Sequence, residues 1–212
     1  MRISIICLLF LFVIAGSANG QNDIEAVKIL DRFSSIAHEA PSVSMKFDLI
    51  KNDLMEKSID TIKGSVILSR DKYRLDTGDN ITWFNGETTW SYLAVEKEVT
   101  ITKAEKKGNS FQNHPSAIFS MYKKGYKRKL VEEKPDSYII DLYPEDIKSD
   151  LVRVRLFIGK SLMDLRCLEY KQRDGILLTL YVKEYNLKIK PESDTFIFQP
   201  VKFSGVDIID MR

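Results

Sequence analysis

The chain has 212 residues, of which 32 are basic and 30 acidic, so its net charge is only +2 at neutral pH. A protein with so little net charge lacks the overall positive electrostatic field with which nucleic-acid-binding proteins attract their partners. The length suits one domain with a sizeable buried core.

The N-terminal residues have the three-part layout of a secretory signal peptide. Arg2 precedes an apolar run at residues 3–14, and small residues follow up to Gly20. This run is shorter than the about 20 apolar residues that cross a bilayer. We therefore expect residues 1–20 to be a cleaved signal and residues 21–212 to form one domain that works outside the cytoplasm.

Removal of this signal leaves Cys167 as the only cysteine. An intramolecular disulfide is then impossible, although the compartment would permit one. Cys167 lies within an alternating apolar pattern, which favours a buried structural thiol over a nucleophile.

Apolar residues at three- and four-residue steps predict an amphipathic helix from Asp23 to Ala40, before Pro41. The stripe consists of Ile24, Val27, Leu30, Phe33 and Ala37. From Ser42 the apolar period changes to two, as in a half-buried strand, with Val43, Met45, Phe47 and Leu49 on one face.

Further short alternating runs predict an antiparallel meander. They lie at residues 62–68, 81–92, 99–102, 138–142, 152–158, 165–170, 178–182 and 196–198. Val66 and Leu68 share the apolar face of the first run, where Ile67 is an exception.

Asn85-Gly86 and Asp174-Gly175 are typical of tight hairpin turns, since these residue types tolerate positive φ. A two-residue loop at Asn85-Gly86 would pair Trp83 with Thr88 and Ile81 with Trp90. One face of this hairpin is then aromatic, with Ile81, Trp83, Trp90 and Tyr92, and the other is polar apart from Phe84.

Residues 115–124 predict a short helix that Gly125 ends, with Ala117, Ile118, Met121 and Tyr122 available as its apolar side. An apolar sheet face with two or three helices can be an ordinary core or a curved sheet around a ligand cavity. Periodicity leaves both alternatives open.

Residue types that carry catalysis are sparse. His38 and His114 have no partner at metal-ligand spacing, and neither a G-x-S-x-G turn nor a phosphate-binding glycine loop occurs. Acidic pairs such as Glu145-Asp146 are typical of solvated loops. We expect no enzyme activity, no metal and no cofactor.

The only dense basic cluster comprises Lys123, Lys124, Lys127, Arg128 and Lys129. It is either a solvated helix end and strand edge that discourages edge pairing, or a site for a lipid head group or an acidic partner.

Arg70 follows Leu68 at a two-residue step, which would put its charge on the apolar face. Either the strand ends at Ser69 and Arg70 points to water, or its guanidinium grips carbonyls at the rim of that face.

Six segments, in order, resemble the periplasmic outer-membrane lipoprotein carrier family, LolA. They are GSVILSR at 64–70, NGETTWSY at 85–92, EVTI at 98–101, PSAIF at 115–119, FIFQP at 196–200 and GVDIID at 205–210. The resemblance extends over nearly the whole chain after the signal.

The resemblance implies an α+β fold, an open (incomplete) antiparallel β-barrel with helices covering its concave apolar face. That face would hold lipoprotein acyl chains, and Arg70 would be the lid contact. Asp71 stands where the family commonly has proline. The cavity wall would comprise Met45, Phe47, Val66, Leu68, Ile81, Trp83, Trp90, Tyr92 and Phe119.

The resemblance also implies a function, a monomeric periplasmic carrier that moves lipoproteins towards the outer membrane. Its partners would be an inner-membrane lipoprotein-releasing transporter and an outer-membrane acceptor. The alternative is a lipid-binding or envelope-stress-sensing module of the same fold.

Overall fold

The structure is a computed structural model that describes residues 18–104 and 114–212, with side chains from residue 24 onward. The expected signal segment therefore lies almost entirely outside the described residues. The sequence also predicts a polar loop from Ala104 to Asn113, and all of it except Ala104 lies outside the described residues. Within the described ranges, no helix combines the length and apolar character needed to span a membrane.

The described chain forms one long helix, twelve strands and three short 3-10 turns. The helix is α1 (Ala18–Glu39), and the turns are η1 (Pro115–Phe119), η2 (Met121–Lys123) and η3 (Pro200–Lys202). The strands are β1 (Val43–Asp53), β2 (Ser58–Ser69), β3 (Lys72–Asp76), β4 (Asn80–Phe84), β5 (Thr88–Leu93), β6 (Glu98–Lys103), β7 (Tyr126–Glu133), β8 (Ser137–Pro144), β9 (Leu151–Gly159), β10 (Leu165–Gln172), β11 (Ile176–Asn186) and β12 (Asp207–Asp210).

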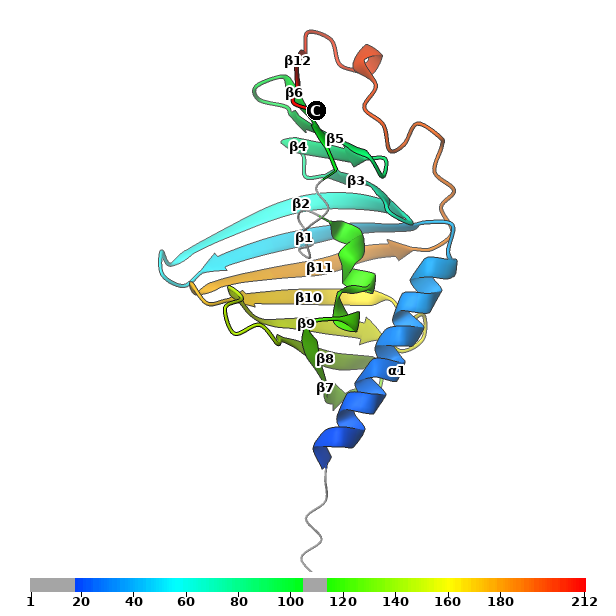
Figure 1. Ribbon diagram of the computed structural model, residues 1–212, viewed down its shortest axis with the longest axis vertical. Coiled ribbons are helices and arrows are strands. Elements are labelled where there is room, and N and C mark those ends of the chain that lie inside the picture. Colours follow the sequence, from blue (N-terminus) through cyan, green and yellow to red (C-terminus); the bar gives the residue numbers. More distant parts are fainter. Residues whose placement is uncertain (1–17, 105–113) are drawn as a thin grey trace, which may run out of the picture.

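All twelve strands belong to one unclosed sheet, ordered β12-β6-β5-β4-β3-β2-β1-β11-β10-β9-β8-β7. Neighbours pair antiparallel except β12, which runs parallel to β6. In Figure 1, α1 lies diagonally across β7 to β10, and the C-terminal segment runs along one side of the molecule to reach β6. The predicted open, mostly antiparallel sheet is confirmed, with β12 as the parallel exception.

The face of the sheet that meets α1, here called the inner face, is apolar across half of the strands. Cross-strand pairing aligns one row of side chains on it, because directly paired residues share a face. The row runs Leu49, Leu180, Leu168, Leu156, Ile140 and Leu130. Four of its members are buried to 1 % exposure or less, so this row forms the floor of the main core.

The opposite, outer face of the same strands carries charges. Arg155 makes two hydrogen bonds to Asp141, at 2.6 and 2.8 Å, and the Tyr143 hydroxyl donates to Asp141 at 2.9 Å. Arg153 pairs with Glu169 at 2.9 Å. This half of the sheet therefore has one apolar face and one ionic face, as period-two alternation requires.

Helix α1 packs on the inner face through Ala26, Ile29, Leu30, Phe33 and Ala37, all buried. Ile24 is exposed and Val27 half-buried, so the buried stripe is rotated from the predicted one. The helix itself is confirmed, although it begins at Ala18.

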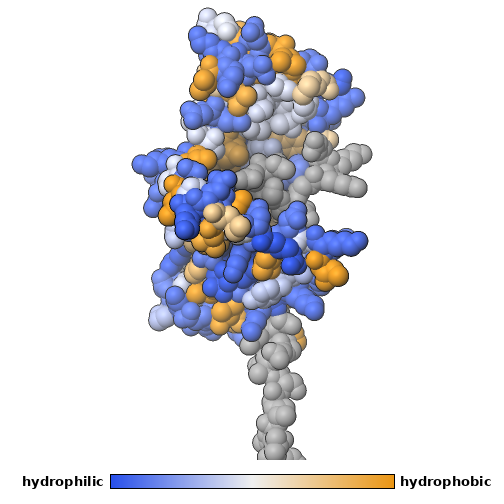
Figure 2. Space-filling model, turned by 90° about the vertical axis from the view of Figure 1, so that its left-hand side faces the viewer, coloured by the Kyte–Doolittle hydropathy of each residue, from blue (hydrophilic) through white to orange (hydrophobic). Residues whose placement is uncertain are grey.

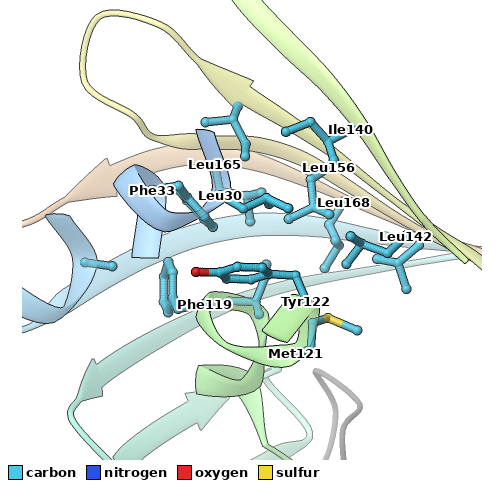
Figure 3. Close-up of a cluster of buried hydrophobic side chains, with 14 of the residues drawn as sticks. Leu30, Phe33, Phe119, Met121, Tyr122, Ile140, Leu142, Leu156, Leu165 and Leu168 are labelled. Atoms are coloured by element: carbon cyan, nitrogen blue, oxygen red, sulfur yellow. The ribbon is translucent and has the colours of Figure 1, made fainter. Parts of the chain in front are cut away.

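Instead of the predicted single helix, residues 115–123 form two 3-10 turns. Ile118, Phe119, Met121 and Tyr122 are buried against α1 and the inner face. Figure 3 shows Phe119 and Tyr122 beside Leu30 and Phe33, with leucines from the sheet behind them. Gly125 follows with φ +78°, a conformation that favours glycine.

A second, smaller core lies on the outer face of the other half of the sheet. Trp83, Val99 and Ile101 are buried there beneath Phe198, with Phe203 packed against them. The C-terminal segment thus folds back over β4, β5 and β6 before it adds β12 to the sheet. Residues 196–198 lie in this segment without strand pairing, so the strand predicted there is wrong.

The two predicted hairpin turns are present but differ in detail from the prediction. Trp83 pairs with Trp90 and Ile81 with Tyr92, so Gly86 and Glu87 are the central turn residues, and Asn85 caps the turn by accepting from the amides of Glu87 and Thr88. Each residue of the first strand thus pairs two residues further along the second strand than predicted. Because two residues is one full period of a strand, the aromatic side chains stay on one face. The second connection lies between Gln172 and Ile176, with Gly175 at φ +89°.

Gly64 leaves room for an aromatic ring. It pairs with Phe47 on the inner face, and a Cβ at this position would lie 2.6 Å from Phe47 Cζ and 2.9 Å from the Asp76 carbonyl oxygen. Real Cβ atoms do not approach so closely, so a larger residue here must displace the buried ring or the neighbouring strand.

We expect Gly64→Ala to lower the free energy of unfolding by about 1–3 kcal/mol, because it overpacks the core. Chemical denaturation measures this. Ser65→Ala, whose side chain points to the other face, should change stability by no more than about 0.5 kcal/mol. The loss should shrink in a Phe47→Leu background. An equal loss in both backgrounds would contradict the ring contact as its cause.

Candidate functional site

Five of the predicted wall residues come together in the main core. Met45, Phe47, Val66, Leu68 and Phe119 are each at most 4 % exposed and belong to one cluster with α1. Four of them come from adjacent strands β1 and β2, and Phe119 faces them from η1. The inner face is therefore a continuous apolar surface beneath α1 and the 3-10 turns.

The other four predicted residues lie on the opposite face of the sheet. Trp83 is buried in the second core, and Ile81, Trp90 and Tyr92 are partly buried against it. The rings of Phe203 and Tyr92 are 4.8 Å apart, and Phe203 and Trp83 are 5.6 Å apart. The expectation of one apolar face shared by all nine residues is wrong.

Strand β3, which the sequence analysis missed, explains the split. It lies between β2 and β4 and pairs Leu68 with Tyr73, which in turn pairs with Phe84. The face of Leu68 therefore continues to Phe84, while Trp83 points the other way. Ile67 and Phe84, the two exceptions to the predicted pattern, were the signal that the apolar side changes faces.

A polar contact that sequence analysis also missed joins α1 to η2. The Tyr122 hydroxyl donates to Asp31 Oδ1 at 2.6 Å, and we call this contact the clasp. Burial, together with this hydrogen bond, raises the pKa of Tyr122 to about 12. The phenol therefore remains protonated, and able to donate, over the physiological pH range.

Two more contacts hold the 3-10 turns in place. Arg128 of β7 donates to the Tyr122 carbonyl oxygen at 3.2 Å, and the rings of Phe33 and Phe119 lie 5.1 Å apart. The first contact links η2 to the sheet, and the second links η1 to α1. Figure 3 shows the labelled side chains of α1 and the turns gathered together, with leucines of the sheet beside them.

Arg70 lies outside the strand, in the two-residue turn between Ser69 and Lys72. It is exposed, and its φ is +55°. Within residues 18–104 and 114–212, its guanidinium makes no hydrogen bond or ion pair. It nevertheless lies beside the end of α1 and the start of η1, where it lines a small hollow.

Two hollows flank the main core. The smaller, of about 50 Å³, lies between the end of α1, the β2–β3 turn and η1, and its lining includes His38, Leu68, Arg70 and Phe119. The larger, of about 340 Å³, lies between α1 and β7 and is lined by Ile24, Val27, Lys28, Lys127 and Arg128. Both combine apolar side chains with cations.

Neither hollow brings together a set of catalytic side chains in the described part of the chain. Cys167 is buried on the outer face, and burial raises the pKa of its thiol to about 11. In the described part of the chain, no three His, Cys, Asp or Glu side chains are placed to bind a metal ion. The inner face instead provides a large apolar surface. It is covered by α1, η1 and η2, and a few polar contacts hold this cover in place.

The fold occurs in a solved structure of an uncharacterised conserved protein from Thermus thermophilus, which aligns with a TM-score of 0.58 at 13% identity, over 88% of this chain and 99% of that chain. Two other solved structures align less closely. A LolA superfamily protein from Nitrosomonas europaea has a TM-score of 0.42 at 12% identity, over 83% and 98%. The lipoprotein LppX from Mycobacterium tuberculosis has a TM-score of 0.46 at 10% identity, over 79% and 98%.

A search of curated proteins found no match to this chain. A family model does match it: the model for the outer membrane lipoprotein carrier protein LolA covers residues 16–164, from α1 to the end of β9. This match extends over more than half of the chain and includes η1, η2 and the clasp. The chain belongs to the LolA family of outer membrane lipoprotein carrier proteins.

Proposed function

We propose that the chain is a carrier that binds lipoprotein acyl chains against its inner face and moves them across the periplasm. In this proposal the sheet is an incomplete barrel, and α1 with η1 and η2 covers its concave face. The role is one of binding, without catalysis. The signal at residues 1–20 would direct export, and residues 21–212 would be the working domain.

One observation carries this proposal: the cover of the inner face is held by few directed contacts. The apolar contacts of α1 and the turns have no preferred direction, whereas the clasp and the Arg128 contact are specific. Asp31 is exposed, so its carboxylate is hydrated when the clasp opens. A cover with these properties can move aside while the sheet stays paired.

The energetics favour such a carrier. Each methylene group left in water costs about 0.8 kcal/mol, so one acyl chain of about fifteen carbons faces a cost on the order of 10 kcal/mol in an aqueous space. Replacing the side chains of α1 and η1 on the inner face with hydrocarbon keeps that face dry during transport. Loading then exchanges one apolar contact for another.

Family membership supports two partners for this carrier, a lipoprotein-releasing transporter of the inner membrane and an acceptor at the outer membrane. Transfer of a lipoprotein from loaded protein to acceptor membranes distinguishes carriage from lipid sensing. A lipid-binding or stress-sensing module of the same fold would hold its ligand without passing it on.

Arg70 fits this proposal as a contact at the rim rather than on the inner face. It lines the small hollow with residues from α1 and η1, the two parts that would separate on loading. Its proposed role is to meet polar groups that reach this rim when the cover moves.

Native tryptophan fluorescence should stay unchanged when an acyl lipid binds, because the chain has two tryptophans and both lie on the outer face. A Phe119→Trp reporter on the inner face should shift, since hydrocarbon replaces its packing partners. Fluorescence titration with a long-chain lipid measures both, with circular dichroism as the check on folding. A shift in the native chain and none in the reporter would place the lipid on the outer face.

Tyr122→Phe should speed lipid loading several-fold at a stability cost of about 1 kcal/mol, because it removes the clasp but keeps the buried ring. Stopped-flow mixing with a fluorescent acyl lipid measures the loading rate. Tyr143→Phe is the matched control, since it removes a phenol–carboxylate hydrogen bond of 2.9 Å on the outer face. Equal loading rates in all three proteins would show that the clasp does not limit opening.

A further inference from the structure

The α1–β7 end of the molecule carries a basic surface that the carrier function does not explain. It comprises Lys28, Lys123, Lys124, Lys127, Arg128 and Lys129, and all except Arg128 are exposed. Within the described chain, none of the six forms an ion pair, although eleven other basic side chains do. The charge of this surface is therefore available to a partner.

The acidic groups around the basic surface, Glu25 and Asp31 of α1 among them, form no ion pair with it in the described residues. Asp31 is engaged by Tyr122. Glu145 lies next to the basic surface, because its backbone amide donates to the Gly125 carbonyl oxygen at 2.9 Å. Its side chain forms no ion pair in the described chain. Glu132 and Glu133, at the far end of β7, pair with Lys134 and Lys160. For a chain with a net charge of only +2, this is a local concentration of positive charge.

An apolar hollow lies within the basic surface. The 340 Å³ hollow has Ile24 and Val27 of α1 on one side and Lys28, Lys127 and Arg128 around it. Ile24 is 60% exposed, so its side chain is accessible to a ligand from solvent. Apolar side chains ringed by cations match a ligand with a negative head and an apolar body. Figure 2 views the molecule from the left-hand side of Figure 1, away from α1, where apolar side chains lie scattered among hydrophilic ones.

Edge protection accounts for only part of this arrangement. β7 is the last strand of the sheet, and lysines on an edge strand discourage pairing with another chain. That explains Lys127 and Lys129, which alternate with the inward Arg128 and point to the outer face. It explains neither Lys28 on α1, nor Lys123 and Lys124 before the strand, nor the apolar hollow among them.

We propose that the basic surface docks this end of the molecule on an anionic phospholipid bilayer. The lysines would lie among the phosphate groups, and Ile24 and Val27 would reach the boundary of the acyl chains. Apart from Arg128, the side chains of this surface lie outside the inner face, so this inference goes beyond the proposed function and does not depend on which cargo is carried. It also places Arg128, which holds η2, next to the membrane where cargo enters or leaves.

The test is sedimentation of the full chain, from residue 21 onward, with two kinds of vesicle. We expect binding to vesicles of equal parts phosphatidylcholine and phosphatidylglycerol, and none to phosphatidylcholine alone. Because one lysine near an anionic membrane contributes about a five-fold factor, Lys124→Glu/Lys127→Glu should lower the partition coefficient at least about 25-fold. Raised salt should weaken wild-type binding in the same direction.

Lys63→Glu/Lys171→Glu is the matched control, because both lysines are exposed, lie on strands, point to the outer face and form no ion pair in the described structure. It should bind vesicles like the wild type. Failure of the wild type to bind anionic vesicles, or equal loss in both variants, would overturn the proposal. Binding to an acidic polypeptide but not to vesicles would also overturn it, in favour of a protein partner.

Acyl-lipid loading measured on the same variants separates the two proposals. Both variants should load like the wild type, because neither changes the inner face or the clasp. Vesicle binding that persists in a chain unable to load lipid would leave the docking surface standing while the carrier function fails.

Discussion

Continuous hydrogen bonding across the sheet is the constraint on which the rest of the structure depends. Directly paired residues of neighbouring strands share a face, so the orientation of one side chain determines that of its partners across all twelve strands. The row from Leu49 to Leu130 is the result on the inner face. The same registry puts Asp141, Arg155 and Glu169 side by side on the outer face.

The two halves of the sheet use this constraint in opposite ways. From β2 through β1 to β8 the inner face is buried, by α1 and the 3-10 turns. From β4 to β6 it is the outer face that is buried, by the C-terminal segment. The inner face of that second half instead carries hydroxyl side chains such as Thr82, Ser91 and Thr100, which pair with one another across β4, β5 and β6. The apolar surface available beneath α1 therefore ends near Phe84.

Local periodicity was sufficient to predict α1 and nine of the strands, because each has a clear 3.6- or two-residue pattern. β3 was missed although its Tyr73 and Leu75 alternate with polar residues, and β7 was missed although Tyr126, Arg128 and Leu130 do the same. In both strands the many charged neighbours obscured the two-residue pattern. β12 is exposed along its whole length and has no amphipathic signal at all. Its pairing with β6 depends on distant residues, which a local pattern cannot contain.

The site was predictable only where one face could be followed without crossing a missed strand. Met45, Phe47, Val66 and Leu68 lie on adjacent strands, and their grouping was correct. Trp83 and its neighbours were assigned to the same face because the hairpin was oriented by its apolar side alone. The clasp could not be predicted, since the Asp31 and Tyr122 side chains are brought together only by the packing of η2 against α1.

The C-terminal segment has a consequence for the order of assembly. Asp207 of β12 pairs with Glu98 of β6, and Phe198 and Phe203 complete the core around Trp83. These contacts need the last residues of the chain, whereas β11, which pairs with β1 in the main core, ends at Asn186. In a chain that is synthesised from its amino end, the main core can form before these residues are available. The aromatic surface around Trp83 then stays open to water until the last residues arrive, which makes it the part of the newly made chain most in need of protection by a chaperone.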